Sequence, residues 1–329
     1  MDLREVNISL TDACNSRCIM CGIWERQDTK EFDRSFLSQL PRSLKSINLA
    51  GGEPFLRRDL LVIVQGLKDA CPFARVVIST NGFLTELIIE DVEEILKIEP
   101  KIAIRISLDG IEKVHDRIRG YPGAYNCAMI TLRGLKKIGV KDLGINITVI
   151  NENIMHLNEV YDLSKTMGVK FNCQIAHSSD FYFRKDNEEI IDKNLFRNHL
   201  NQIMGKELKG FGPYRLFKVY YYKGIWDYVN HFPRTYRCLA GNLFCYIDSR
   251  GDIYPCIMLE EKMGSLKENS FLEIWKSCSA DLVREKVKKC NRNCWLICTS
   301  APAIKNSPYK ALPWILKNKA KAHLGCKIV

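Results

Sequence analysis

The chain has 329 residues, of which 46% are hydrophobic and 26% charged, and its formal net charge is +11. This length predicts one large domain, or one large and one small domain. No run of 18 apolar residues and no signal-peptide pattern occurs, which excludes a membrane-spanning or secreted class and leads us to expect a cytoplasmic protein.

Strand-like runs alternate with segments of helical periodicity through the first half of the chain. The strand-like runs are Glu5–Thr11, Ser46–Ala50, Arg75–Thr80, Lys101–Leu108, Gly144–Ile150 and Val169–Ala176, and the helical segments include Leu60–Leu67, Glu90–Ile98 and Tyr125–Ile138. Such alternation predicts parallel strands joined by crossover helices. Six units predict an α/β fold over residues 1–180, a partial (β/α)6 barrel of the TIM type, whose ligands bind beyond the carboxyl ends of the strands.

The pattern changes after residue 180. Residues 181–236 are polar and aromatic-rich, and we interpret them as a connector of helix and loop that completes the barrel and its substrate cavity. Residues 237–300 contain a predicted hairpin, Phe244–Asp248 with Ile253–Cys256, and a capping-box pattern at Ser270 and Glu273 that predicts a helix towards Lys289. Residues 301–329 form a basic tail, and we expect a solvated helix packed by Trp314 rather than a helix on anionic lipid.

Three cysteines follow the first predicted strand with the spacing C-x3-C-x2-C, namely Cys14, Cys18 and Cys21. Zinc sites and closed iron–sulfur sites use four protein ligands, whereas three cysteines can hold a [4Fe–4S] cube with one iron open. The chain has fourteen cysteines, and in a cytosolic chain of this size such a number favours metal ligation over disulfides. A structural zinc site is the alternative for this spacing alone.

With these cysteines the sequence resembles the radical S-adenosylmethionine (radical SAM) superfamily. Further matching segments are Gly51-Gly52-Glu53-Pro54, Ser79-Thr80-Asn81-Gly82 and Ser107-Leu108-Asp109-Gly110, the last of which continues to Arg119. The resemblance implies that the open iron binds S-adenosylmethionine, whose reductive cleavage gives a 5′-deoxyadenosyl radical that removes a hydrogen atom from the substrate.

The same resemblance implies roles for individual residues. Cys14, Cys18 and Cys21 would bind the cluster, and Gly51, Gly52 and Glu53 would receive the amino group of S-adenosylmethionine. Ser107 and Arg119 would contact its carboxylate, and Asn81 or Asp109 would lie near the ribose or the substrate. Asn81 and Asp109 each precede a glycine, so simple turn formation is an equal alternative for both.

The last third resembles the auxiliary-cluster regions called SPASM and, when shortened, twitch. Cys238-x12-Gly251-x4-Cys256 fits the opening pattern, but the closing part departs from it, with Cys290-x3-Cys294-x3-Cys298. The resemblance implies one auxiliary [4Fe–4S] cluster held by Cys238, Cys256 and two of Cys290, Cys294 and Cys298, with Cys245 as a contender for one place. Zinc on the same thiolates is the alternative.

We therefore expect a radical SAM oxidoreductase whose auxiliary cluster accepts an electron from the substrate. The sequence before Cys14 is too short for a leader-peptide domain, so we expect a small polar substrate: a sugar, an aminocyclitol, or a phosphorylated or lipid-linked metabolite. Contacts to it are expected from the basic and aromatic residues Arg184, Arg215, Tyr220, Tyr221 and Trp226.

Three alternatives stay open: a peptide or protein maturase, redox-neutral chemistry, and a zinc- or cluster-bearing nucleic-acid-binding protein. We do not expect nucleic acid, because no dense basic stripe is interleaved with stacking aromatics. The expected partner is a one-electron donor such as flavodoxin or ferredoxin. No catalytic acid or base can be assigned from the sequence.

Overall fold

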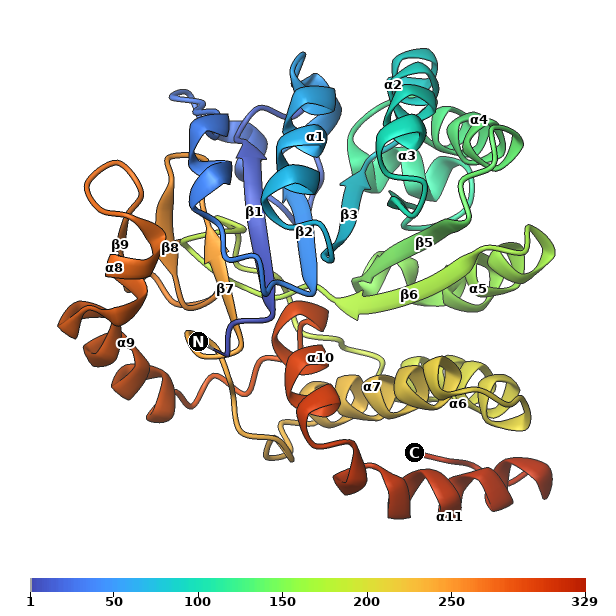
Figure 1. Cartoon of the computed structure of the whole chain (residues 1–329). Coiled ribbons are helices and arrows are strands. Elements are labelled where there is room, and N and C mark those ends of the chain that lie inside the picture. Colours follow the sequence, from blue (N-terminus) through green and yellow to red (C-terminus); the bar gives the residue numbers. More distant parts are fainter. Residues whose placement is uncertain (1) are drawn as a thin grey trace.

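A nine-stranded sheet organises the chain, which the computed structural model describes over residues 2–329. Six parallel strands follow the predicted runs closely: β1 (Glu5–Thr11), β2 (Ser46–Gly51), β3 (Arg75–Thr80), β4 (Ala103–Ser107), β5 (Asp142–Val149) and β6 (Lys170–Ile175). They lie in sequence order, and the curved sheet stays open between its edge strands, β6 and β9 (Figure 1). The predicted partial α/β barrel is therefore confirmed.

Helices cover the outer face of this sheet (Figure 1). They are α1 (Leu60–Ala70), α2 (Thr85–Ile98), α3 (Lys113–Arg119), α4 (Ala124–Lys137) and α5 (Leu157–Thr166), with short 3-10 helices at Ile23–Glu25, Arg34–Gln39, Pro54–Leu56, Asn151–His156 and Pro308–Lys310. In α1 the buried residues Leu60, Ile63, Val64 and Leu67 fall on one face, as the spacing of an amphipathic helix requires. The main hydrophobic core lies between the buried faces of these helices and the sheet.

The predicted connector consists mainly of two long helices, α6 (Lys193–Lys209) and α7 (Pro213–Val229), which pack against each other beside β6 and α5. The C-terminal tail forms α11 (Leu312–His323), which lies along them (Figure 1). Trp314 meets Tyr220 of α7 edge to face, with ring centroids 5.7 Å apart. The tail helix is thus packed through Trp314, as predicted. No helix within residues 2–329 is long and apolar enough to cross a membrane.

The predicted hairpin, β7 (Phe244–Ile247) and β8 (Asp252–Tyr254), is antiparallel and is followed by β9 (Gly264–Ser265). Strand β7 pairs in parallel with β1, with Glu5 opposite Phe244 and Ile8 opposite Ile247. The C-terminal region therefore extends the barrel sheet instead of forming a separate layer.

The helix predicted to run towards Lys289 is interrupted. Ser270 and Glu273 form the expected capping box at the start of α8 (Phe271–Lys276), but α8 ends at Ser277 and α9 (Cys278–Lys288) begins there. Ser277 has an extended backbone, and its hydroxyl accepts the N–H of Ala280 at 3.1 Å, so it caps the second helix. One more helix, α10 (Ile297–Asn306), precedes the tail helix α11.

Candidate active site

A cavity of about 270 Å³, here called the central cavity, lies at the carboxyl ends of the parallel strands. It is lined by Cys14, Cys18, Cys21, Gly51, Gly52, Glu53, Asn81, Ser107 and Arg119, and also by Asn146, Thr148, Gln174, His177, Tyr182, Phe183, Ile257, Leu296 and Cys298, among others. Six strand ends thus contribute to one space. Of the residues predicted to bind the cluster or S-adenosylmethionine, only Asp109 does not line it.

Asp109 lies one layer behind the cavity wall. It is fully buried, and its carboxylate bonds the Arg119 guanidinium at 2.6 Å and accepts the backbone N–H of Thr148 at 2.8 Å. Arg119 also reaches the Cys18 sulfur, with Nη1 3.5 Å from Sγ. The structure therefore gives Asp109 the role of orienting Arg119, rather than a turn role alone.

The cysteine loop is fixed to the end of α3. The backbone N–H groups of Arg17 and Ile19 donate to the carbonyls of Arg119 and Ile118 at 2.9 and 3.0 Å. Gly120 ends α3 in the left-handed conformation, and a Cβ there would approach the Arg17 carbonyl oxygen to 2.6 Å. A glycine is needed at this position so that the loop can pack closely against the helix.

The glycine pair after β2 also lets two backbone segments lie close together. The N–H groups of Gly52 and Glu53 donate to the carbonyls of Thr11 and Ala13 at 2.7 and 2.8 Å. A Cβ on Gly52 would lie 1.9 Å from the Ala13 carbonyl oxygen, a separation that no real contact reaches. Since Cys14 follows Ala13 directly, this contact helps to place the first thiol.

Glu53 is a buried carboxyl group in the cavity wall. It accepts the backbone N–H of Asn81 at 2.8 Å and that of Phe55 at 3.2 Å, and Asn81 in turn donates to the Asn15 side chain at 2.6 Å. Burial raises the pKa of Glu53 to about 7. A ligand ammonium beside it would favour the ionised form.

The thiols of the cysteine loop are held in a dry environment. Burial raises the pKa of Cys14 to about 12 and that of Cys21 to about 11. Without metal these thiols are protonated at neutral pH, so iron binding releases their protons. The Ser16 hydroxyl lies 3.0 Å from the Cys18 sulfur, and hydrogen bonds to sulfur tune a cluster's potential. Three thiols on one loop, which is hydrogen-bonded to the end of α3 and lines the central cavity, fit a [4Fe–4S] cluster with one open iron.

Four of the predicted auxiliary cysteines line a second cavity of about 210 Å³, here called the auxiliary cavity. They are Cys238, Cys256, Cys290 and Cys294. Cys298 instead lines the central cavity, and Cys245 is fully buried in β7 within the main core and lines neither. Cys245 is thus apart from the other thiols, whereas Cys298 packs on the same apolar cluster as Cys238, Cys256 and Cys294 but lines the other cavity.

Among residues 2–329, no three His, Cys, Asp or Glu side chains are placed to hold a single metal ion. In a [4Fe–4S] cube each thiolate binds a different iron, so its four ligands surround a volume instead of converging on one point. Because Cys238, Cys256, Cys290 and Cys294 all line the auxiliary cavity, they fit a cluster of this kind.

His177 joins the barrel to the auxiliary region, a link that no sequence pattern indicated. One ring nitrogen, Nδ1, lies 2.8 Å from the Ile175 carbonyl oxygen, and Nε2 accepts the backbone N–H of Trp295 at 3.1 Å. The ring stacks on Tyr228 with centroids 4.3 Å apart. Burial lowers the pKa of His177 to about 4, so the ring is neutral and keeps both bonds at neutral pH.

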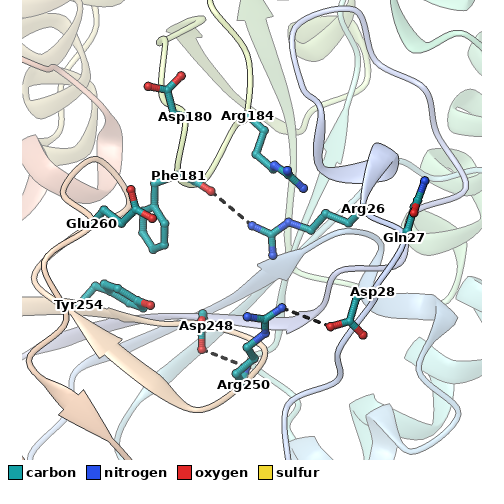
Figure 2. Close-up of a pocket in the computed structure, with 10 residues that line it drawn as sticks. All are labelled: Arg26, Gln27, Asp28, Asp180, Phe181, Arg184, Asp248, Arg250, Tyr254 and Glu260. Atoms are coloured by element: carbon teal, nitrogen blue, oxygen red, sulfur yellow. Dashed lines mark hydrogen bonds and ion pairs between the residues drawn. The ribbon is translucent and has the colours of Figure 1, made fainter.

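A third cavity of about 360 Å³, here called the outer cavity, is drawn in Figure 2. Phe181 lines the outer cavity, whereas the next two residues, Tyr182 and Phe183, line the central cavity. Figure 2 shows the guanidinium groups of Arg26, Arg184 and Arg250 gathered on one side of it, facing the rings of Phe181 and Tyr254.

The charged side chains of the outer cavity differ in whether they already form ion pairs. Arg26 is paired with buried Asp12 at 2.8 Å, and Arg250 lies 3.6 Å from Asp28, whereas Arg184 forms no ion pair within residues 2–329. The wall also carries Asp28, Asp180, Asp248 and Glu260. Arg26 and Arg250 come from loops far apart in the sequence and belong to no motif, so sequence reasoning missed them.

Of the other predicted substrate contacts, Arg215 is 2.8 Å from Glu207, and Tyr220 and Tyr221 are buried in the core around α7. None of these three, nor Trp226, lines the central or the outer cavity. Their aromatic and basic character is used in packing the connector helices.

Two family models match the chain: the radical SAM superfamily over residues 8–164, and an iron-sulfur cluster-binding domain, SPASM, over residues 238–299. An AdoMet-dependent heme synthase of Methanosarcina barkeri is 27% identical over 82% of this chain and 80% of its own length. A pre-heme d1 synthase of Dinoroseobacter shibae is 28% identical over 81% of this chain and 72% of its own.

Solved structures share the fold. SuiB of Streptococcus suis bound to S-adenosylmethionine has a TM-score of 0.65 at 17% identity, covering 87% of this chain and 68% of SuiB. The enzyme anSMEcpe with bound AdoMet and a peptide has a TM-score of 0.63 at 16% identity, covering 96% of this chain and 99% of that one. The chain therefore belongs to the radical SAM superfamily, with a [4Fe–4S] cluster and S-adenosylmethionine as cofactors and a C-terminal auxiliary iron–sulfur region of the SPASM type.

Proposed function

We propose that this enzyme oxidises a carboxylate-bearing tetrapyrrole by removing a hydrogen atom from it. The radical chemistry rests on one observation above all: a single cavity unites Cys14, Cys18 and Cys21 with the Gly51-Gly52-Glu53 segment and Arg119. The substrate class is supported by the names of relatives that match about four fifths of the chain, a heme synthase and a pre-heme d1 synthase. These names give tetrapyrroles precedence over the sugar or aminocyclitol that we expected from the sequence.

Each group of cavity residues has a part in this proposal. When bound, the cluster and S-adenosylmethionine supply a carbon-centred radical, and the auxiliary cluster supplies an electron acceptor. Cys14, Cys18 and Cys21 hold the first cluster through their thiolates. Glu53 is proposed to receive the ammonium of S-adenosylmethionine, because a buried carboxyl group with a raised pKa gains from a cationic partner. Arg119, oriented by Asp109, is proposed to face its carboxylate.

For the auxiliary cluster we propose Cys238, Cys256, Cys290 and Cys294 as the ligands. They are the cysteines that surround the auxiliary cavity, and four thiolates complete a [4Fe–4S] site. Cys245 is left out of this set because it is buried in the main core, and Cys298 because it lines the central cavity.

The outer cavity supports a substrate with carboxylates and a flat apolar body. Arg184 has no ion pair within the described residues and is available for a carboxylate, while Phe181 and Tyr254, which pack on each other with ring centroids 4.5 Å apart, add an apolar part to the wall. Asp28 and Asp248 repel an anion only weakly. Asp28 is paired with Lys30 at 2.5 Å, and Asp248 accepts the backbone N–H groups of Arg250 and Asp252. Asp180 and Glu260 form no ion pair within residues 2–329 and remain as negative charges on the wall.

The test is an anaerobic assay of the reconstituted enzyme with S-adenosylmethionine and dithionite. We expect 5′-deoxyadenosine to form, and we expect iron-coproporphyrin III, a tetrapyrrole with propionate side chains, to lose mass in proportion. Sugars, aminocyclitols and peptides serve as comparison substrates. Turnover of a peptide or a sugar without any change in the tetrapyrrole would replace the substrate class, and a lack of 5′-deoxyadenosine under all conditions would reject the reaction itself.

We also propose a cytoplasmic location. All fourteen cysteines are free in the structure, and thiols that must bind iron are kept reduced in that compartment. The zinc-bearing nucleic-acid-binding alternative is set aside, because the chain belongs to an enzyme superfamily.

A further inference from the structure

A groove of about 730 Å³, here called the basic groove, lies beside Cys238 in the C-terminal region. It shares Arg237, Cys238, Val287 and Lys288 with the auxiliary cavity, so the two spaces are neighbours. Their walls carry six basic side chains, Arg4, Arg234, Arg237, Lys276, Arg284 and Lys288, and two acidic ones, Asp2 and Asp281.

Some of these charges are already used inside the protein. Arg284 is bonded to the carbonyls of Gly241 and Trp275, both at 2.7 Å, and to Asp281 at 2.6 Å. Arg234 donates to the carbonyls of Cys294 and Thr299, and Lys288 is paired with Glu285. Three cations remain, Arg4, Arg237 and Lys276, which are exposed and form no ion pair within residues 2–329. Asp2, which also forms no ion pair within these residues, offsets one of the three charges, so the groove presents a net positive charge to solvent.

The auxiliary thiols lie between this groove and the central cavity. Ile257, Leu296 and Cys298 line the central cavity, whereas Cys256 and Cys294 from the same two segments line the auxiliary cavity. Cys290 is exposed, and Cys238 lines the groove itself. A cluster on these thiols would be close to the substrate on one side and close to the protein surface on the other.

We propose that the basic groove is the docking surface for an acidic one-electron carrier protein, which exchanges an electron with the auxiliary cluster through the Cys238 side. This inference rests on the proposed ligand set of that cluster. When the substrate has been oxidised, the cluster loses one electron and the carrier gains one, with no bond formed or broken. An acidic partner is favoured because complementary charge steers encounter and orients a carrier for transfer.

The test compares two charge-reversal variants with the wild-type holoenzyme. Arg4→Glu/Lys276→Glu changes the part of the groove that does not line the auxiliary cavity, and Arg133→Glu/Lys137→Glu makes the same change in charge on the exposed face of α4, at the far end of the molecule (Figure 1). The probe is a purified acidic flavodoxin, and its dissociation constant is measured by biolayer interferometry at several salt concentrations. Iron content and the cluster absorption spectrum check that each variant is intact.

We expect the groove variant to bind the carrier at least about ten-fold more weakly and to lose most of the salt dependence, while the α4 variant behaves as wild type. With dithionite as reductant, all three proteins are expected to form 5′-deoxyadenosine at the same rate. Equal carrier affinity in the groove variant and wild type, or no salt-dependent binding by wild type, would overturn the docking surface. A wild-type protein that binds the carrier but forms no 5′-deoxyadenosine with dithionite would instead reject the proposed function.

Discussion

Cys294 and Cys298 are only four positions apart, yet their thiols line different cavities. Each lies where a short irregular segment meets the start of α10, and the backbone turns between them. Sequence patterns could offer six candidate cysteines for the auxiliary cluster, but they could not decide which of them share one space. That choice depends on tertiary packing around His177 and Trp295, which local sequence patterns do not report.

Iron analysis of two alanine variants tests this assignment. Cys290→Ala is expected to lower bound iron and sulfide by up to the content of one cluster, because an auxiliary ligand is lost. Cys298→Ala is expected to keep the wild-type iron and sulfide content after anaerobic reconstitution. The reverse result, with iron lost only in the Cys298 variant, would contradict the proposed ligand set.

Gly52 is a second residue whose role is steric. Gly52→Ala forces its Cβ against the Ala13 carbonyl, so the cysteine loop must shift. We expect the variant to retain less of the first cluster and to form 5′-deoxyadenosine at least about ten-fold more slowly, since misplacement by about 1 Å can cost a hundred-fold in rate. The matched control is Gly205→Ala on α6, where the nearest neighbour of a new Cβ is 4.0 Å away. Equal loss in both variants would mean that the Ala13 contact is not the cause.

At the scale of elements, the six parallel strands were predictable because each is a short β-rich run followed by a helical segment. The motif loops were predicted to meet for the same reason: parallel strands present their carboxyl ends at one edge. Two features were not predictable. The pairing of β7 with β1 joins residues about 240 positions apart and leaves no local pattern, and the break at Ser277 depends on one extended residue within a helical pattern.

The connector helices α6 and α7 are held by buried Glu207, which bonds Lys165 at 2.6 Å, Arg215 at 2.8 Å and Tyr161 at 3.0 Å and lies 3.5 Å from buried Lys218. Burial alone would raise the pKa of Glu207, but Lys218 and Lys165 outweigh it and hold the pKa at about 2. A carboxyl group with a depressed folded pKa adds stability above its unfolded pKa. We therefore expect this contribution to be lost as the pH falls from about 4.5 towards 2.

Urea unfolding at neutral pH measures the same network. Glu207→Gln is expected to lower the free energy of unfolding by about 3–5 kcal/mol, because it leaves Lys218 buried without an anionic partner. Adding Lys218→Met should recover part of that loss, since the uncompensated charge is then removed. A double variant as unstable as, or less stable than, Glu207→Gln alone would show that the loss has another origin.

At the scale of the whole molecule, the barrel and the auxiliary region form one sheet. Backbone N–H groups of Arg4 and Glu5 donate to the Leu243 carbonyl, and Lys305 is paired with Glu5 at 2.7 Å. The sequence divided the chain at residues 180, 236 and 300, and motif content alone could not show that β1 needs β7 as a neighbour. A boundary between motifs is therefore not a boundary between sheets here.

We expect the two regions to unfold together. Circular dichroism and tryptophan fluorescence should follow the same urea transition, because removing the auxiliary region exposes the β1 edge and its apolar faces. A chain ending at residue 236 should be insoluble or should unfold at much lower urea concentration. Two separate transitions in the full chain, or a stable, cooperatively folded 1–236 fragment, would contradict this expectation.

The His177 ring has no freedom to tilt on its own. It contacts the Ile175 carbonyl at the end of β6, the backbone N–H of Trp295 and the face of the Tyr228 ring. Displacement of the imidazole must therefore strain at least one of these contacts. We expect a molecule that displaces His177 in the wall of the central cavity to shift the segment between Cys294 and Cys298 as well. Because Leu296 and Cys298 line the same cavity, we expect this ring to be one of several contacts that link substrate binding to the surroundings of the auxiliary cysteines.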